Sequence, residues 1–345
     1  MILVTGNTGY IGMVMTEFLQ AYGYEVIGLD TNYYEGCDFY SAARKPRRQI
    51  TQDVRDVTKA DLAGVKTIIH LAALSNDPLG ELRPTLTQEI NYLASVRLAR
   101  LAVEAGVERF IFSSSCSLYG IAPNDVPLTE ANAFNPVTVY AQTKVATEKA
   151  LAQLADEHFH PVFMRNATVY GVSPRLRLDL VVNNLVAAAF TTGRVSILSD
   201  GMPWRPIIHV KDFCRAFLAV LAAPIEVVHN QAFNVGINEE NYRIKDIARR
   251  VEKIIPGCTM EILNQTGADE RTYRVDFSKI KKQIPGFQPI WNVDKGIQEL
   301  YESYREIGLT REDFESPKYF RVKWIKYLRE SNRLNQDLLW EKVLI

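Results

Sequence analysis

A tyrosine and a lysine four positions apart, Tyr140 and Lys144, have the residue types and the spacing for acid–base chemistry. Side chains four apart lie on the same face of a helix, one turn from each other. A lysine ammonium next to a phenol stabilises the phenolate and lowers the phenol pKa from about 10. The pair therefore predicts a general base that can take a proton from a hydroxyl group.

A second pair, Tyr319 and Lys323, has the same spacing, so the surroundings must separate the two. Only Tyr140 follows a predicted strand that ends in a serine-rich segment, Ser113–Gly120. Parallel sheets place such strand ends in the ligand crevice. There, the Ser115 hydroxyl can bond the same substrate oxygen that the tyrosine deprotonates. We interpret the second pair as a coincidence.

A glycine-rich turn, Thr5–Gly12, carries the strongest local signal. It follows an apolar strand and opens an amphipathic helix, which is the setting a dinucleotide fingerprint requires. Gly6, Gly9 and Gly12 allow a tight turn and let backbone N–H groups approach a pyrophosphate at a helix N-terminus. The spacing is GxxGxxG, which indicates one branch of the dinucleotide-binding proteins.

Asp30 ends the next predicted strand, near the offset at which an acid accepts hydrogen bonds from the adenosine ribose. A 2′-phosphate would be repelled there, and no arginine follows before Arg44. The expected cofactor is NAD and not NADP. Asp53 and Val54 follow a further apolar segment, where an adenine could be held. The alternative for Asp30 is an ordinary turn residue.

Short apolar runs alternate with amphipathic stretches through the first half of the chain. The expected strands are Ile2–Thr5, Glu25–Leu29, Thr67–His70, Arg109–Ser113 and Pro161–Arg165. The expected helices are Tyr10–Tyr22, Thr87–Ala105 and Val137–Leu154. This alternation predicts an α/β fold with a Rossmann-type, doubly wound parallel sheet.

The pattern becomes less regular after about residue 170, where glycines and prolines cluster. We expect an NAD-binding Rossmann domain over residues 1–168, completed by a segment near 205–236. A smaller substrate-binding lobe is expected over 169–309. Residues 310–345 are charged and aromatic and are interpreted as a helical extension packed on the surface.

Composition excludes several classes of protein. The 345 residues carry 40 basic and 40 acidic side chains, so general binding to nucleic acid has no support. No apolar run reaches the length of a membrane span, and no signal peptide is evident. Four scattered cysteines are read as reduced thiols of a cytoplasmic protein, and no metal site is expected.

Taken together, the motifs identify a family resemblance. They are Thr5–Gly12, Asp30, His70–Ala73, Asn91, Ser113–Gly120, Tyr140–Lys144, Asp200–Gly201, Arg205, Ile208–Val210, Phe233–Gly236 and Asp276–Lys279. In this order, over about residues 1–305, the sequence resembles an extended short-chain dehydrogenase/reductase. Within that group it is similar to the NAD-dependent nucleotide-sugar epimerase/dehydratase family, typified by UDP-glucose 4-epimerase.

The resemblance implies a role for each matched residue. Tyr140 would be the catalytic base, Lys144 its electrostatic partner, and Ser115 the anchor of the substrate hydroxyl. Cofactor contacts would come from Gly6, Gly9, Tyr10, Ile11, Gly12, Asp30, Asp53, Val54, Leu71, Ala72, Ala73, Asn91, Ser113, Tyr140 and Lys144. Substrate contacts would come from Ser115, Ser117, Thr168, Asn184, Leu185, Arg205, Arg271 and Tyr273.

Some of these assignments have plainer alternatives, and several positions depart from the family pattern. Arg205 could be a surface charge and Asn184 a loop or cap residue. The Asp-Glu pair that follows the anchor serine in family dehydratases is replaced by Cys116 and Ser117. Dehydration therefore lacks its obvious acid and base.

Three further departures concern the 4-epimerases within the family. Thr168 and Ser75 replace an asparagine and a lysine found there. The arginine that 4-epimerases carry ahead of the last motif has no clean match. Arg271 or Arg274 is expected to take its place.

The resemblance favours an epimerase acting at C4 of a nucleotide-diphosphate sugar through a transient 4-keto sugar. A nucleotide-sugar dehydrogenase or 4-keto reductase would use the same three catalytic residues and remains the alternative. A non-catalytic dinucleotide sensor is the third reading, although Ser115, Tyr140 and Lys144 are all intact. A homodimer is implied, with helices 87–105 and 137–154 at its interface.

Overall fold

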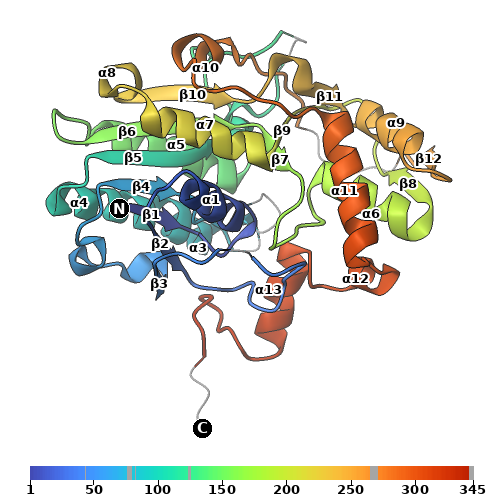
Figure 1. Ribbon diagram of the computed structural model, residues 1–345, viewed down its shortest axis with the longest axis horizontal. Helices are drawn as coiled ribbons and strands as arrows, with labels where there is room; N and C mark the ends of the chain where they lie inside the picture. The colour runs from blue at the N-terminus through green and yellow to red at the C-terminus, as the bar shows by residue number, and fades with distance from the viewer. Residues whose placement is uncertain (43, 76–79, 82, 123–125, 265–270, 342–345) are drawn as a thin grey trace.

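A parallel sheet forms the larger half of the computed structural model, which describes all residues except 43, 76–79, 82, 123–125, 265–270 and 342–345 (Figure 1). Among the described residues, seven strands pair in the order β10-β6-β5-β4-β1-β2-β3, every pair parallel. They are β1 (Ile2–Thr5), β2 (Val26–Asp30), β3 (Arg48–Thr51), β4 (Thr67–His70), β5 (Arg109–Ser115), β6 (His160–Asn166) and β10 (Gln231–Val235). The strand order turns back between β1 and β4, which confirms the Rossmann-type fold.

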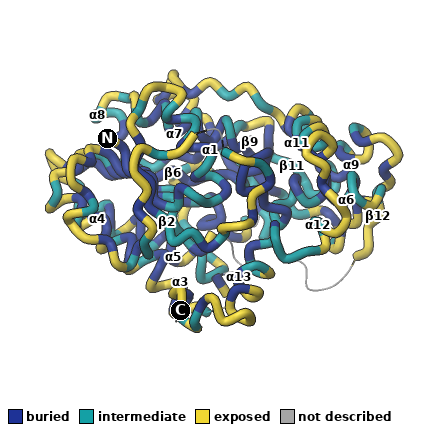
Figure 2. The backbone as a smooth tube through the Cα atoms, turned by 60° about the horizontal axis from the view of Figure 1, so that its bottom comes forward, coloured by how far each residue is buried: buried dark blue, intermediate teal, exposed yellow. Residues whose placement is uncertain are grey.

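Helices cover both faces of this sheet, so its central strands are buried on both sides. Val4 faces the cluster that includes α1 (Tyr10–Ala21) and α7 (Val210–Ala222). Its neighbour Leu3 faces the opposite cluster, which includes α4 (Ala94–Ala105). Helix α5 (Val139–Ala152) packs beside α4. Dark blue, buried segments accordingly run through the middle of the molecule in Figure 2.

The expected elements occur with two differences. Strand β3 was not predicted, because it is an edge strand with Ile50 as its single buried residue and so has no apolar run. The helix expected over 87–105 is interrupted: α3 (Pro84–Gln88) leads into a π-helical turn, Glu89–Leu93, before α4. Such turns often occur at functional sites, and this one carries Asn91.

The second half is a smaller lobe built on two short sheets. One has the order β11-β9-β7 and the other pairs β12 with β8. The strands are β7 (Thr168–Tyr170), β8 (Arg194–Ile197), β9 (Trp204–His209), β11 (Asn241–Arg243) and β12 (Thr259–Ile262). Packed around them are α6 (Val181–Thr192), α9 (Ile244–Ile254), α11 (Val293–Ile307) and α12 (Arg311–Glu315).

The segment near 205–236 is divided between the two halves. Strand β9 belongs to the small lobe, whereas α7, α8 (Ile225–Val228) and β10 lie on the large sheet. The short helix α10 (Ser278–Gln283) then packs against β10. No helix among the described residues has the length and apolar character that crossing a membrane would require.

The C-terminal extension returns to the Rossmann half, a placement different from a helix resting on the surface. Helix α13 (Arg321–Glu330) buries Ile325 and Leu328 in the same cluster as the strands β2 and β4. Leu334 and Leu338 extend this contact beyond the helix. The buried positions are spaced among lysines and arginines, so the sequence pattern predicted a helix packed on the surface.

Candidate active site

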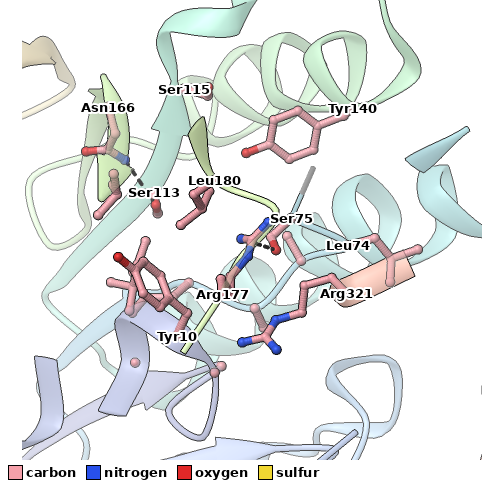
Figure 3. A pocket seen from close by; sticks show the side chains of 18 of the residues that line it. Tyr10, Leu74, Ser75, Ser113, Ser115, Tyr140, Asn166, Arg177, Leu180 and Arg321 are labelled. Atoms are coloured by element: carbon pink, nitrogen blue, oxygen red, sulfur yellow. Dashed lines mark hydrogen bonds between the residues drawn. The ribbon is translucent and has the colours of Figure 1, made fainter. Parts of the chain in front are cut away.

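One cavity of about 610 Å³ opens at the carboxyl ends of the parallel strands (Figure 3). Its walls come from the glycine turn, the ends of β2, β4 and β5, the start of α5, strand β7 and the start of α13. The sequence-predicted residues on its lining are Gly6, Gly9, Tyr10, Ile11, Gly12, Asp30, Asp53, Val54, Leu71, Ala72, Ala73, Ser113, Ser115, Ser117, Tyr140, Lys144, Thr168, Arg205, Arg271 and Tyr273. Residues from the whole chain therefore meet in one place.

Three predicted contact residues do not reach this lining. Asn91 is buried behind the wall, where its side-chain amide accepts from Leu74 N–H at 2.8 Å and donates to Leu74 C=O at 3.2 Å. It positions the loop after β4 and does not face the cavity. Asn184 donates to Leu178 C=O at 2.7 Å, and Leu185 is buried in the lobe core.

The glycine turn has the shape that a pyrophosphate needs. Gly6 has φ +73°, and a Cβ there would lie 2.8 Å from the Ala72 nitrogen. A Cβ on Gly12 would overlap the Gly6 carbonyl oxygen. Helix α1 begins directly after Gly9, and no side chain caps its first N–H groups. These donors can meet an anion, so the residues present fit a dinucleotide.

The two predicted adenosine-side carboxylates are held in different ways. Asp30 accepts from Thr8 N–H at 3.0 Å through Oδ2 and from Asn32 N–H at 2.9 Å through Oδ1. This fixes its orientation at the end of β2. Asp53 is instead clamped by the Arg55 guanidinium at 2.8 and 2.9 Å. The Asp53 carboxylate is therefore engaged with the protein itself.

The predicted catalytic side chains converge on the other half of the cavity. Thr138 caps α5 by accepting from Ala141 N–H at 3.2 Å, which places Tyr140 in the first turn. The Lys144 ammonium lies 5.5 Å from the Tyr140 ring centroid and donates to Ser113 C=O at 2.7 Å. In Figure 3 the Tyr140 hydroxyl and Ser115 border the same space.

Lys144 is almost completely buried, and this changes its proton affinity. Burial lowers the pKa of its ammonium from 10.5 to about 7, while the Glu148 charge acts in the opposite direction. The Phe112 ring lies 4.6 Å below the ammonium and supplies a further favourable contact. A lysine poised near neutral pH can release or accept a proton next to the tyrosine.

We expect Lys144→Met to separate activity from stability. The variant should lose about 10²- to 10⁴-fold in turnover, because the phenolate loses its cationic partner.

The unfolded chain binds the lysine proton up to pH 10.5, whereas the folded chain releases it near pH 7. Wild-type stability therefore rises with pH between these values. The free energies of unfolding of the two proteins, measured in urea, should differ most below pH 7. The difference should shrink as the pH rises toward 10.5. A pH-independent difference would contradict this.

Three buried polar atoms on the lining have no hydrogen-bond partner among the described residues: Ser117 Oγ, Asn166 Oδ1 and one terminal nitrogen of Arg321. The Asn166 amide nitrogen donates to Ser113 Oγ at 3.1 Å and to Ser114 C=O at 2.8 Å, whereas its buried amide oxygen has no partner in the described part of the chain. Buried polar atoms without a partner indicate a place for a ligand. Asn166 was not predicted, although it ends β6 opposite Ser115 and strand ends are the signal.

The second tyrosine–lysine pair is separated by the fold. Tyr319 is buried in the lobe core, and its hydroxyl donates to Asp38 C=O at 3.3 Å. Helix α13 begins only at Arg321, so Tyr319 and Lys323 do not share a helical face. Lys323 lies 4.1 Å from the Phe320 ring at the cavity rim.

Two arginines line the part of the cavity where the substrate is expected. Arg205 is 8% exposed and donates to Trp204 C=O at 2.9 Å and to Arg271 C=O. Arg271 itself lines the cavity, whereas Arg274 lies over the Trp204 ring at 4.8 Å and does not. Of the two candidates for the missing family arginine, Arg271 is therefore the one at the site.

Sequence reasoning missed two further arginines on the lining, Arg177 and Arg321. Arg177 pairs with Asp179 at 2.9 and 3.1 Å and donates to Ser75 Oγ at 3.3 Å. Neither arginine belongs to a motif, and they enter the cavity from the small lobe and from the extension. Among the described residues no cluster of His, Cys, Asp and Glu could hold a metal ion.

Comparisons with known proteins agree with this geometry. The chain is 29% identical to the UDP-glucose 4-epimerase of Mycolicibacterium smegmatis, over 88% of this chain and 98% of that protein. It is 26% identical to UDP-glucuronic acid decarboxylase 1 of Arabidopsis thaliana, over 90% of this chain and 71% of that protein. The solved structure of MoeE5 in complex with UDP-glucuronic acid and NAD is similar with a TM-score of 0.77 at 25% identity, covering 88% of this chain and 99% of that one.

A family model described as the NAD dependent epimerase/dehydratase family matches residues 2–236, more than half of the chain. The match confirms the family resemblance and NAD as the cofactor. Its boundaries include the glycine turn and all three predicted catalytic residues. This chain therefore belongs to the NAD-dependent epimerase/dehydratase family, the extended short-chain dehydrogenase/reductases that act on nucleotide sugars.

Proposed function

We propose that the protein is an NAD-dependent epimerase that inverts C4 of a nucleotide-diphosphate sugar. The observation that carries the proposal is the convergence of Ser115, Tyr140 and Lys144 on a cavity shared with the glycine turn. The 4-epimerase relatives support the reaction type. When bound, NAD supplies the acceptor and later the donor of a hydride.

The protein's own residues handle the proton and the orientation of the sugar. Ser115 would hold the reacting hydroxyl by a hydrogen bond while the Tyr140 phenolate takes its proton. Lys144 keeps the phenolate charged, because its ammonium lies beside the ring. The proton returns from Tyr140 after the keto sugar has exposed its other face. The reaction is redox-neutral over one turnover.

The diphosphate would serve as an anchor while the sugar turns. Arg205 and Arg271 lie together on the substrate side. One guanidinium group can bind two phosphate oxygens at once through two parallel hydrogen bonds. Tyr273 and Thr168 line the adjoining sugar space, with Ser117 Oγ offering a polar contact. Binding energy from a remote diphosphate can be used to position the reacting carbon.

Dehydration has little support from the residues around Ser115. Cys116 is buried and donates to Arg165 C=O at 3.1 Å, and burial raises its pKa well above the ordinary value. It therefore neither faces the cavity nor offers an acidic group. A dehydrogenase or 4-keto reductase would use the same catalytic residues and is the second candidate. The intact catalytic residues argue against a non-catalytic sensor.

The decisive experiment incubates the purified protein with UDP- and dTDP-sugars and substoichiometric NAD, and follows the products by NMR. For an epimerase we expect an isomer of equal mass in large excess over the NAD supplied, with the changed carbon identified by its coupling constants. Conversion limited to the NAD present, with NADH appearing, would instead establish the dehydrogenase. Loss of water from the product would contradict both.

We also propose a homodimer through α4 and α5. Leu93 is 56% exposed at the junction with α4, and Val103 is 38% exposed on α4. Leu93→Asp should convert a dimer to a monomer in sedimentation experiments, because a buried charge opposes association. Leu198→Asp, at an equally exposed leucine of the small lobe (56%), is the matched control and should remain dimeric. A monomeric wild type would overturn the proposal.

A cytoplasmic location is proposed on the state of the cysteines. All four, Cys37, Cys116, Cys214 and Cys258, are buried free thiols. Proteins of oxidising compartments more often pair such residues in disulfides.

A further inference from the structure

The C-terminal extension is fastened to the loop that follows β2, next to Asp30. Trp324 Nε1 donates to Tyr33 C=O at 2.8 Å, and Trp340 Nε1 donates to Thr31 C=O at 2.7 Å. Apolar side chains of α13 are buried in the Rossmann core beneath this loop. The extension therefore forms one wall on the adenosine side of the cavity.

Arg321, the first residue of α13, brings a buried charge to that wall. It is 1% exposed, its guanidinium lies 3.9 Å from the Tyr34 ring centroid, and one nitrogen donates to Arg175 C=O at 3.0 Å. Its other terminal nitrogen is buried and has no hydrogen-bond partner in the described part of the chain. Figure 3 shows this guanidinium beside that of Arg177, both reaching into the cavity.

Positive charge exceeds negative charge in this cluster. Arg177 pairs with Asp179, and Arg175 lies 3.4 Å from Asp38, whose side chain is half exposed. No carboxylate of the described residues forms an ion pair with Arg321. Burial lowers its pKa to about 10, and the Arg177 charge acts in the same direction. A buried cation without a counter-ion is costly, so an anionic ligand would stabilise the cluster.

The position of the cluster indicates which anion it meets. Tyr34 follows β2 and contacts Arg321, and Ser75 follows β4 and accepts from Arg177. The charges of Arg177 and Arg321 also act on the phenol of Tyr10, opposing the rise in pKa that its burial causes. These are the strand ends around the glycine turn, where a dinucleotide pyrophosphate lies. The arginines assigned to the substrate, in contrast, are Arg205 on β9 and Arg271, whose backbone carbonyl accepts from Arg205.

We propose that Arg321 binds the pyrophosphate of the cofactor from the side opposite the glycine turn, so that the C-terminal extension retains NAD between turnovers. The inference rests on the proposed use of NAD as a regenerated cofactor. Arg177 is a second cationic contact, held in place by Asp179 and Ser75. An epimerase benefits from such retention, because its NAD is never consumed.

The test measures NAD binding and release, not turnover. Full-length Arg321→Met and wild-type protein, both freed of nucleotide, are titrated with NAD by calorimetry. NAD release from loaded protein is followed after adding an excess of competitor. We expect the Kd for NAD to rise about 10- to 100-fold, the size of one charge-assisted hydrogen bond, mainly through faster release. Arg321→Lys keeps the charge and should restore part of the affinity.

Controls separate the sources of the effect. Arg329→Met removes an exposed arginine of the same helix and should bind NAD like wild type. Adenosine, which lacks phosphate, should bind Arg321→Met as tightly as it binds wild type. UDP, added to NAD-loaded protein, should also bind the variant and wild type equally tightly. An unchanged Kd for NAD, or equal losses for adenosine and NAD, would overturn the inference. A loss confined to UDP would assign Arg321 to the substrate diphosphate and also overturn it.

Poor folding of the methionine variant would not remove the test. In that case, inorganic pyrophosphate is tested as a competitor of NAD on wild type and on Arg321→Lys. Equal inhibition constants for the two proteins would contradict the inference. The proposed function fails separately, because wild-type protein that binds no NAD contradicts that function whatever Arg321 does.

Discussion

Tyr140→Phe should abolish nearly all turnover and alter NAD binding only slightly. The substitution removes one oxygen atom from the side chain and keeps the ring beside the Lys144 ammonium, 5.5 Å from its centroid. The reacting hydroxyl then has no base, although Ser115 can still hold it. Loss of a positioned general base lowers rates by about 10²- to 10⁴-fold. Steady-state kinetics on the active nucleotide sugar, with a parallel NAD titration, measures both effects.

The second tyrosine–lysine pair provides the control. Tyr319→Phe removes a hydroxyl that bonds to Asp38 C=O outside the catalytic half of the cavity. We expect its turnover to remain within about twofold of wild type, with only a small loss of stability from one hydrogen bond. Comparable losses in both variants would show that tyrosine hydroxyls matter for folding here, and would remove the catalytic assignment of Tyr140.

Glu148→Leu should produce the largest loss of stability among the substitutions considered. Glu148 lies one turn beyond Lys144 and accepts from the Arg165 guanidinium at 2.8 to 3.2 Å. Both side chains are about 5% exposed. Removing one partner leaves a buried charge without its counter-ion, which costs about 3–5 kcal/mol of unfolding free energy. Urea denaturation, with the slope checked against wild type, measures it.

Two comparisons make that result specific. Glu148→Leu combined with Arg165→Met removes both charges and should regain much of the lost stability. Glu108→Gln breaks an exposed pair with Lys66, where the side chains are 56% and 64% exposed, and should cost less than about 1 kcal/mol. If Glu148→Leu and Glu108→Gln lost equally little free energy of unfolding, the buried Glu148–Arg165 pair would not contribute specially to stability.

Glu148 also connects stability with chemistry. Its charge raises the pKa of Lys144 against the effect of burial. Glu148→Leu should therefore lower the Lys144 pKa further and reduce the protonated fraction at neutral pH. The alkaline limb of the activity profile should shift to lower pH in this variant, provided it is assayed at a temperature where it remains folded.

The sequence alone determined the family, the cofactor and most of the Rossmann half. Strand β1, the glycine turn and the start of α1 lie within about a dozen consecutive residues. An apolar run, spaced glycines and an amphipathic pattern predict each of them from the nearby sequence. The spacing of Tyr140 and Lys144 needs only a helix to place both on one face. Such short-range patterns can be read from neighbouring residues in the chain.

Only the tertiary structure decided which residues from distant segments complete the site. Asn91 has a family motif position yet turns its amide to the backbone of Leu74, away from the cavity. Arg321 lies in a stretch that reads as a charged surface, yet it is buried against Tyr34, far earlier in the sequence. The physical reason is the same in both cases: the direction of a side chain depends on what packs against its element. That packing is a long-range property, which local spacing and residue type do not contain.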